Sequence, residues 1–206
     1  MLVRRATQAD ASQLATLVFT SAPNLLSLIF TTSPQTKVMD FLQASLTQPN
    51  GQYGYANHWV IEVEQQLVAC ICAWSRNLPA SFHQATLASL VKFYSAEDLL
   101  KVIQRSEVLK DCIPQPTDNE WCIGHVAVAG SYQRQGLGKK LLLTMQQQAR
   151  SASKKSLSLD VDCTNTAAIS FYLKHGFKQQ SQSIVSAKMQ TLGIAQHLHL
   201  VQDLNN

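Results

Sequence analysis

The chain has 206 residues, with 17 Lys and Arg against 13 Asp and Glu, and a formal net charge of +4. Hydrophobic residues make up 46% and charged residues 15%, which is the balance of a globular protein rather than a disordered one. The basic residues are scattered, which argues against a nucleic-acid-binding stripe. No stretch is apolar for long enough to span a bilayer, and the first residues do not resemble a signal peptide. We therefore expect a cytoplasmic protein with neither nucleic acid nor membrane as a partner.

The five cysteines lie at positions 70, 72, 112, 122 and 163. An odd number without a Cys-x-x-Cys pair argues against a disulfide framework and against a zinc site. His197 and His199 share one face of the last predicted strand, but no third ligand lies near them in the sequence. We expect no metal site, cysteines that serve as small buried hydrophobes, and a surface-facing histidine pair.

The first part of the chain predicts a short strand and two helices. Residues 2–5 read as a strand, and Asp10 caps an amphipathic helix that Pro23-Asn24 interrupts. Ser33-Pro34 predicts the start of a second helix, because proline is favoured at the first helical position.

The middle of the chain predicts a hairpin followed by helices. Residues 58–64 alternate as a strand, residues 67–74 read as a second, nearly all-apolar strand, and Gln65-Gln66 is the expected turn between them. Residues 76–119 have a helical pattern, with a capping box that begins at Ser95. We expect two helices in this region.

The last third of the chain alternates strands and helices. Strands are expected over 120–128, 157–161, 178–189 and 195–201, and helices over 136–150 and 166–174. The whole pattern predicts a mixed α/β fold in one domain over residues 1–206.

The loop between the strand 120–128 and the following helix has the features of a phosphate cradle. Gly136 and Gly138 let the backbone approach a ligand closely, and the first helical turn presents free N–H groups. Arg134 and Lys139 add positive charge. The spacing fits neither a Walker A loop, which would need glycine in place of Gln133, nor the dinucleotide fingerprint, which would need glycine in place of Leu141.

Two motifs resemble the GNAT superfamily of N-acetyltransferases. Gln133-Arg-Gln-Gly-Leu-Gly138 is similar to the family's Arg/Gln-x-x-Gly-x-Gly/Ala loop, which binds the pyrophosphate of coenzyme A. Asn165-Thr-Ala-Ala-Ile-Ser-Phe-Tyr-Leu-Lys-His-Gly-Phe177 is similar to the family's Asn-x-x-Ala-x-x-Phe/Leu-Tyr-x-x-x-Gly-Phe segment. Together the motifs cover residues 120–177.

The resemblance implies a GNAT-like fold, with a mostly antiparallel sheet flanked by helices and splayed at the cofactor site. Residues 76–119 would then be a helical insertion. Acetyl-CoA is the implied co-substrate, without a metal. The residues expected to contact it are Val126, Ala127, Val128, Gln133, Arg134, Gln135, Gly136, Leu137, Gly138, Lys139, Asn165 and Phe171. Among these, Asn165 is equally suited to capping its helix, because asparagine is a preferred cap.

The resemblance also implies the acid and the oxyanion site of the reaction. Backbone N–H groups near Val126 and Val128 would polarise the thioester carbonyl. Tyr172 would protonate the leaving thiolate.

The base is less clearly marked in the sequence. Glu120 shares a strand face with Cys122 and Gly124. Some relatives have their base at the positions of Cys122 or Gly124, which are not suited to this role here. Glu120 would therefore have to reach the amine over a longer distance, through water. His125 falls on the other face unless the strand bulges.

The expected reaction is direct transfer of acetyl to a primary amine in a ternary complex. A non-catalytic acyl-CoA-binding regulatory module is the alternative, since it would keep the cradle and lose the acid. The acceptor stays open between small molecules and peptides, and the oligomeric state stays open between monomer and homodimer.

Overall fold

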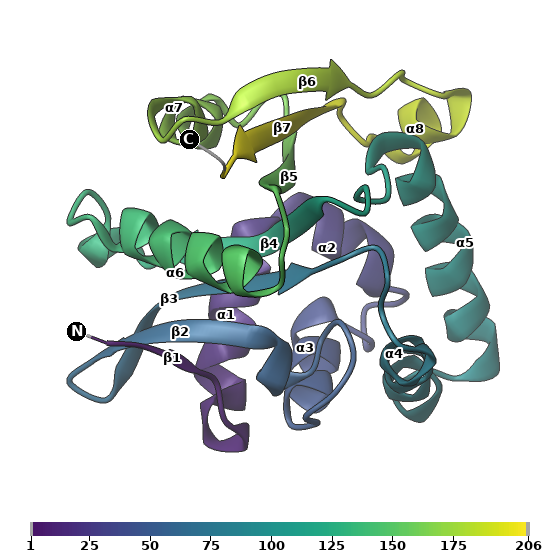
Figure 1. Cartoon of the computed structure of the whole chain (residues 1–206). Helices are drawn as coiled ribbons and strands as arrows, with labels where there is room; N and C mark the ends of the chain where they lie inside the picture. Colours follow the sequence, from purple (N-terminus) through teal and green to yellow (C-terminus); the bar gives the residue numbers. More distant parts are fainter. Residues whose placement is uncertain (1, 205–206) are drawn as a thin grey trace.

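The computed structural model describes residues 2–204, apart from the side chain of residue 111. Strands and helices alternate through this range (Figure 1). In chain order the elements are β1 (Val3–Arg5), α1 (Ala11–Ser21), α2 (Pro23–Phe30), α3 (Val38–Leu46), β2 (His58–Val63), β3 (Gln66–Trp74), α4 (Ala80–Phe93), α5 (Ala96–Cys112), β4 (Glu120–Val128), α6 (Leu137–Ser151), β5 (Ser156–Asp162), α7 (Thr166–Lys174), β6 (Lys178–Gln182), α8 (Ala187–Leu192) and β7 (His197–Asp203).

The strands form a seven-stranded sheet in the order β1-β2-β3-β4-β5-β7-β6. Neighbouring strands are antiparallel, except β4 and β5, which run parallel. The predicted mixed, mostly antiparallel fold is therefore confirmed. Glu64 and Gln65 form the β2–β3 turn with φ of 48° and 64°, the left-handed pair that suits the twist of a two-residue hairpin. The turn thus begins one residue earlier than predicted.

The sheet divides where β4 leaves β5. The two strands pair only at Glu120–Cys122 and Ser156–Ser158, the first three residues of each. Figure 1 shows β5, β6 and β7 in an upper group and β1 to β4 in a lower group. The expected splay is present, and it leaves the second half of β4 without a strand partner on its β5 side.

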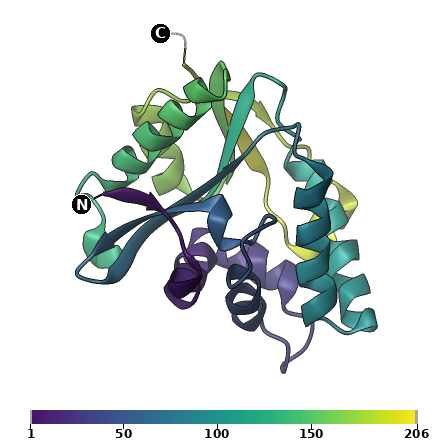
Figure 2. The same ribbon diagram turned by 60° about the horizontal axis from the view of Figure 1, so that its bottom comes forward.

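Helices cover both faces of the sheet (Figure 2). On one face, α6 and α7 pack on the sheet through a core whose fully buried members include Leu141 and Met145. On the other face, α1 and α3 pack around Phe41 and Leu42, and α4 and α5 join the edge of this core. The splayed strands therefore lie between two helical layers.

The N-terminal helices differ from the prediction by one missed helix and by one helix start. The predicted interruption at Pro23-Asn24 is confirmed, because α1 ends at Ser21. Pro23 then opens α2, which was not predicted, as a first-turn proline, the position where its missing N–H has no cost. Ser33-Pro34 does not start α3, which begins at Val38. Instead, the Ser33 hydroxyl and carbonyl both accept from the N–H of Thr36, so serine closes a turn there.

The strand predicted over 178–189 was also wrong in its second half. β6 ends at Gln182, and α8 follows after a short loop. The Ser186 hydroxyl accepts from the N–H of Met189 and caps α8, and Gly193, with φ of +67°, ends it. Met189 is fully buried against α5, so tertiary packing stabilises a helix of only six residues.

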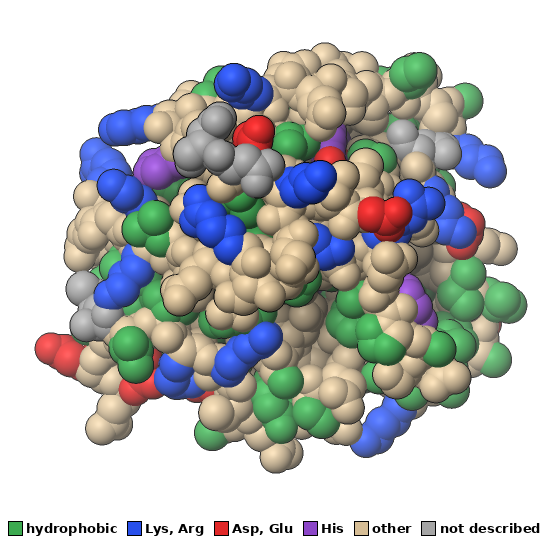
Figure 3. Space-filling model, in the orientation of Figure 1, with side chains coloured by type: hydrophobic (Ala, Val, Ile, Leu, Met, Phe, Trp, Pro, Cys, Tyr) green, Lys and Arg blue, Asp and Glu red, His purple; other side chains and the backbone are tan. Residues whose placement is uncertain are grey.

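The two helices predicted within 76–119 are α4 and α5. The Ser95 hydroxyl accepts from the N–H of Asp98, which is one of the two hydrogen bonds of the predicted capping box. Within the described residues, no single helix is long and apolar enough to cross a membrane. The helical segments 8–21 and 23–30 together have the length and the composition of a membrane span, but the chain bends by 107° between them. On the face drawn in Figure 3, Lys and Arg side chains are dispersed among neutral ones.

Candidate active site

A cavity of about 470 Å³ lies where β4 and β5 diverge. It is bounded by the two strands, by α2, by the end of α5 and by the start of α7. Among the predicted site residues, Val126, Asn165 and Tyr172 line it. The structure therefore brings together residues of both sequence motifs around one cavity.

β4 bulges in the middle of this cavity. The β3–β4 pairing shifts between Gly124 and Ala127, so that His125 and Val126 stand opposite a single residue of β3. His125 has φ of +49°, in the left-handed region that non-glycine residues rarely adopt. Its ring stacks on Tyr53, which belongs to the core of the α1 and α3 side. The bulge thus turns His125 to the face from which regular alternation would exclude it.

His125 forms a hydrogen-bonded pair with His58 of β2. The Nδ1 of His58 lies 3.0 Å from the carbonyl oxygen of Gly54, and its Nε2 lies 3.0 Å from the Nδ1 of His125. Burial lowers the pKa of His58 to about 4 and that of His125 to about 3. Both imidazoles are therefore neutral at physiological pH. A carbonyl oxygen only accepts, so we assign the His58 proton to Nδ1, which leaves Nε2 to accept from His125.

Cys72 lies close enough to the histidine pair to suggest a metal site. Its sulfur and one ring nitrogen of each histidine lie within 4.8 Å of one another. Burial raises the pKa of the Cys72 thiol well above its ordinary value, so without an ion it is a neutral thiol beside the two rings. The hydrogen bond between the two rings accounts for the arrangement without an ion. Burial likewise raises the pKa of Cys70 and Cys122, so neither provides a thiolate nucleophile.

The predicted phosphate loop connects β4 to α6. Arg134 and Gly136 have φ of +60° and +81°, and no side chain caps α6, so the N–H groups of its first turn remain available to an anion. A Cβ at Gly136 would meet nothing within 4 Å, so the space above the helix start is open. The Gln133 amide donates to the carbonyl of Val128 at 3.2 Å and ties the loop to β4. Arg134, Gln135 and Lys139 are exposed around it.

Phe171 joins the two motifs physically. A Cβ at Gly138 would lie 2.9 Å from the Phe171 ring, so glycine at this position allows the ring to pack on the first turn of α6. At the start of α7, the Asn165 side chain accepts from the N–H of Ala168 at 3.1 Å. The capping role expected of Asn165 is confirmed. Its cofactor contact, like that of Phe171 and buried Leu137, stays a prediction.

Tyr172 is 7% exposed and lines the cavity from α7. Its ring lies 5.2 Å from that of Phe171 and 5.4 Å from that of Phe177, centroid to centroid, so it is held by packing on both sides. Burial raises the pKa of the phenol above its ordinary value. Tyr172 is therefore a protonated donor at any physiological pH.

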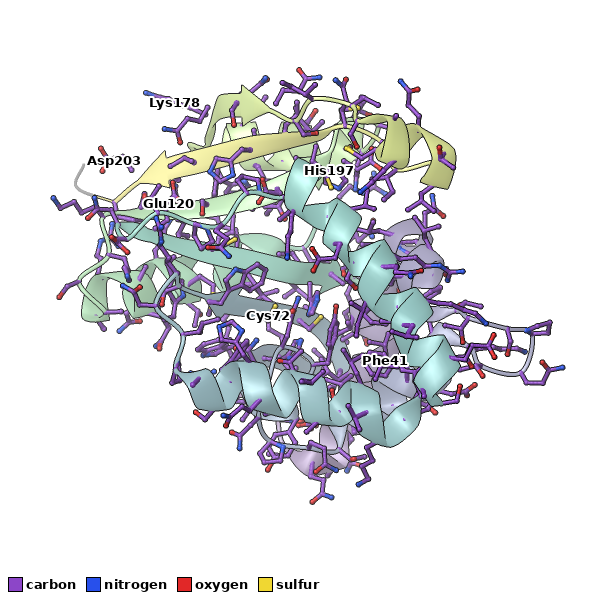
Figure 4. All side chains as sticks on the ribbon, turned by 90° about the vertical axis from the view of Figure 1, so that its right-hand side faces the viewer. Phe41, Cys72, Glu120, Lys178, His197 and Asp203 are labelled. Carbon is purple, nitrogen blue, oxygen red and sulfur yellow. The ribbon has the colours of Figure 1, made fainter. Side chains whose placement is uncertain are left out.

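Glu120 is 6% exposed and, among the described residues, is not one of those that line the cavity. Its Oε2 accepts from the N–H of Thr117 at 2.7 Å, and its Oε1 lies 3.7 Å from the Nε2 of His199. The Nδ1 of His199 lies 2.9 Å from an oxygen of Asp160, which does line the cavity. Figure 4 shows Glu120 on β4 and Cys72 further inside, behind α4 and α5. A role for Glu120 as base stays a prediction, with His199 and Asp160 as its connection to the cavity.

The prediction of a surface-facing histidine pair was wrong. His197 and His199 are only 6% and 8% exposed. β7 is not an edge strand, because it pairs with β5 on one side and β6 on the other. The hydrogen bond that the Nδ1 of His199 donates to Asp160 is the main cause that raises the pKa of His199.

Several cavity residues carry no signal in the sequence. Tyr53 lies in the loop between α3 and β2, Trp74 ends β3 and Ile113 follows α5. They lie far apart along the chain and meet through tertiary packing. His125 was noted in the sequence, but the face of the sheet on which it lies depends on a bulge that strand alternation alone does not predict.

The buried histidine pair predicts acid destabilisation. Both pKa values are depressed in the folded state, so the unfolded chain binds more protons once the pH falls below about 6.5. The free energy of unfolding should then fall between pH 6.5 and about pH 4, by up to about 1.4 kcal/mol per pH unit for each imidazole. Urea unfolding at a series of pH values measures this fall in the free energy of unfolding.

The matched control for this prediction is His83→Gln, which changes an exposed histidine on α4 and should leave the pH dependence as it is. His58→Gln should flatten it. The pKa of His199 is raised in the folded state, so its contribution to the free energy of unfolding is lost as the pH rises above 6.5. His199 therefore does not contribute to the fall below pH 6.5. An unchanged slope in His58→Gln would contradict the assignment.

The comparisons with known proteins agree with the two motifs. The model of the Acetyltransferase (GNAT) family matches residues 23–177. No sequence among the curated proteins matches. An N-acetyltransferase structure from Staphylococcus aureus Mu50 is 22% identical, with a TM-score of 0.72 over 98% of this chain and 100% of that chain. The structure of yncA from Salmonella typhimurium, with its cofactor acetyl-CoA, is 16% identical, with a TM-score of 0.55 over 100% and 95% of the two chains. At such identities these likenesses show the fold.

Proposed function

This chain belongs to the GNAT acetyltransferase family, and from that premise we propose that it transfers an acetyl group from acetyl-CoA to a primary amine by direct attack in a ternary complex. One observation carries the proposal. A single cavity contains Val126 of the splayed strand and the protonated donor Tyr172. The strand that bears Val126 runs on into a loop and an uncapped helix start that suit a pyrophosphate.

The loop residues fit acetyl-CoA in both shape and charge. Above Gly136 there is open space, and the first turn of α6 offers N–H groups that no side chain occupies. Arg134 and Lys139 add positive charge beside it. The unpaired edge of β4 from Val126 to Val128 would bind the pantetheine arm through its backbone, because the sheet has opened there. An N–H of this edge would polarise the thioester carbonyl.

Tyr172 would complete the transfer. When the amine nitrogen bonds to the carbonyl carbon and the C–S bond breaks, the thiolate needs a proton, and a phenol held in the cavity can donate it. The three cysteines of the central strands β3 and β4 are not ionised to act as nucleophiles, since burial keeps Cys70, Cys72 and Cys122 as thiols. These features favour the enzyme over a non-catalytic acyl-CoA-binding module.

The acceptor would approach from the side of α2 and α5. Leu25 and Leu26 of α2, together with Leu109 and Ile113 at the end of α5, line that part of the cavity. The region 76–119, which we propose is an insertion within the domain, would therefore help to shape the acceptor site.

The test is turnover of acetyl-CoA with spermidine, tyramine, lysine and an alanine-initiated peptide as separate acceptors. Release of free coenzyme A thiol and the mass of the acetylated amine are followed together. We expect acetylated product from at least one amine. If acetyl-CoA binds but no primary amine is acetylated, the proposed acceptor class is wrong.

A further inference from the structure

We propose that His125 is the catalytic base of the transfer, that its Nε2 accepts the proton of the acceptor amine, and that His58 is the positioning residue that sets its tautomer. This inference rests on the proposed function, which it deepens by naming the group that activates the amine. It assigns to His125 the step for which the sequence suggested Glu120.

The chain of hydrogen bonds determines which nitrogen of His125 is free. The Gly54 carbonyl accepts from the Nδ1 of His58, so the Nε2 of His58 has a lone pair and accepts from the Nδ1 of His125. In a neutral imidazole only one nitrogen bears a proton. The Nε2 of His125 therefore bears a lone pair, which is the form that a base requires.

The position of His125 suits this task. The residue lines the cavity beside Val126, the next residue of β4, whose backbone would meet the thioester. The bulge, with φ of +49°, turns the ring to the same side of the sheet as Tyr53. Strained backbone of this kind occurs at active sites, where surrounding packing holds it. Here the Cys70 thiol donates to the carbonyl of His125 at 3.1 Å, and His58 holds the ring.

The groups that face the histidine pair keep it neutral. Around His125 they are His58, Tyr53 and Cys72, and burial raises the pKa of both Tyr53 and Cys72, so neither bears a charge. The charge of Arg5 adds to the effect of burial in lowering the pKa of His58. The lone pair of His125 is thus available across the physiological pH range.

The proton balance is complete with these groups. The acceptor nitrogen arrives as an ammonium ion and leaves as an amide, so it loses two protons. One reaches the thiolate, which becomes the free thiol of coenzyme A through Tyr172. The other is accepted by the Nε2 of His125 and passes to solvent.

The first test needs no acceptor. Nitrogen-15 spectra of the histidine rings at pH 7, with His58→Gln and His125→Asn variants to assign the signals, report which nitrogens bear protons. We expect a protonated Nδ1 and an unprotonated Nε2 for His125. A proton on its Nε2 would overturn the proposal, and so would stoichiometric zinc in the purified protein.

The second test measures turnover with acetyl-CoA and the fastest amine of the panel. His125→Gly, which relieves the left-handed backbone, should lower kcat by roughly 100-fold or more without changing the affinity for acetyl-CoA. Added imidazole should restore part of the lost rate. His58→Leu should lower kcat as well, whereas His58→Gln should keep most of it, because an amide can donate to Gly54 and accept from His125.

The outcomes separate this inference from the proposed function. If no amine is acetylated by the wild-type protein, the proposed function fails first. If the wild-type protein is active, full activity of His125→Gly, or loss of activity in Glu120→Gln with His125→Gly unaffected, would overturn the assignment of the base to His125.

Discussion

Replacing Gly136 with glutamate is expected to weaken the binding of acetyl-CoA by roughly 100-fold or more. The side chain would enter the open space above the first turn of α6, where a Cβ meets no other atom within 4 Å. A carboxylate there would oppose the pyrophosphate that the helix N-terminus is proposed to hold. Like charges brought together at a binding site cost several kcal/mol, and about 1.4 kcal/mol is tenfold in affinity. Equilibrium dialysis with labelled acetyl-CoA measures the loss.

Gly136→Asn is the matched control for this variant. Gly136 has φ of +81°, so any side chain there has a backbone cost of about 1–2 kcal/mol in the free energy of unfolding. Asparagine tolerates this conformation better than most residues and adds no charge. We expect Gly136→Asn to keep most of the affinity. Equal affinity of Gly136→Glu and the wild-type protein would show that the loop does not hold the cofactor.

Replacing Tyr172 with phenylalanine is expected to lower kcat by roughly 100-fold or more, since it removes a general acid. The ring would stay in place between Phe171 and Phe177, so the affinity for acetyl-CoA should not change. Because burial raises the pKa of the phenol, the wild-type rate should show no loss from this group until the pH exceeds its ordinary value of 10. Steady-state rates at saturating acetyl-CoA measure the effect.

Tyr55→Phe is the control for Tyr172→Phe, because Tyr55 is half-buried and is not one of the described residues that line the cavity. It should leave kcat unchanged. If Tyr172→Phe were equally active, another donor would have to protonate the thiolate.

The elements around the two motifs were predictable because strong local signals bound them. β4 spans 120–128 and α7 spans 166–174, as the sequence predicts, since Pro116 precedes β4, Asn165 caps α7 and Gly176 follows its end. α2 and α8 were missed for local reasons. For α2, the sequence does not distinguish a proline that opens a new helix from one that only interrupts the previous helix. For α8, six residues are too few to show a helical period, and the helix depends on the burial of Met189.

The candidate site was predictable only where it is local in sequence. The loop from Gln133 to Lys139 and the segment from Asn165 to Tyr172 each form a motif that a single stretch of chain carries. The acceptor side is assembled from residues such as Tyr53, Trp74 and Ile113, which no spacing rule connects. The place of His125 depended on one extra residue in a strand, and a bulge reverses the face of a side chain without a clear mark in the sequence.

The most direct test of the account is a calorimetric titration of the folded wild-type protein with acetyl-CoA. We predict saturable binding at one site per chain, from a ligand whose pyrophosphate lies at the start of α6. If the folded protein releases no binding heat at any temperature and dialysis also shows no bound acetyl-CoA, the cavity between β4 and β5 is not an acetyl-CoA site, and the proposed reaction fails with it.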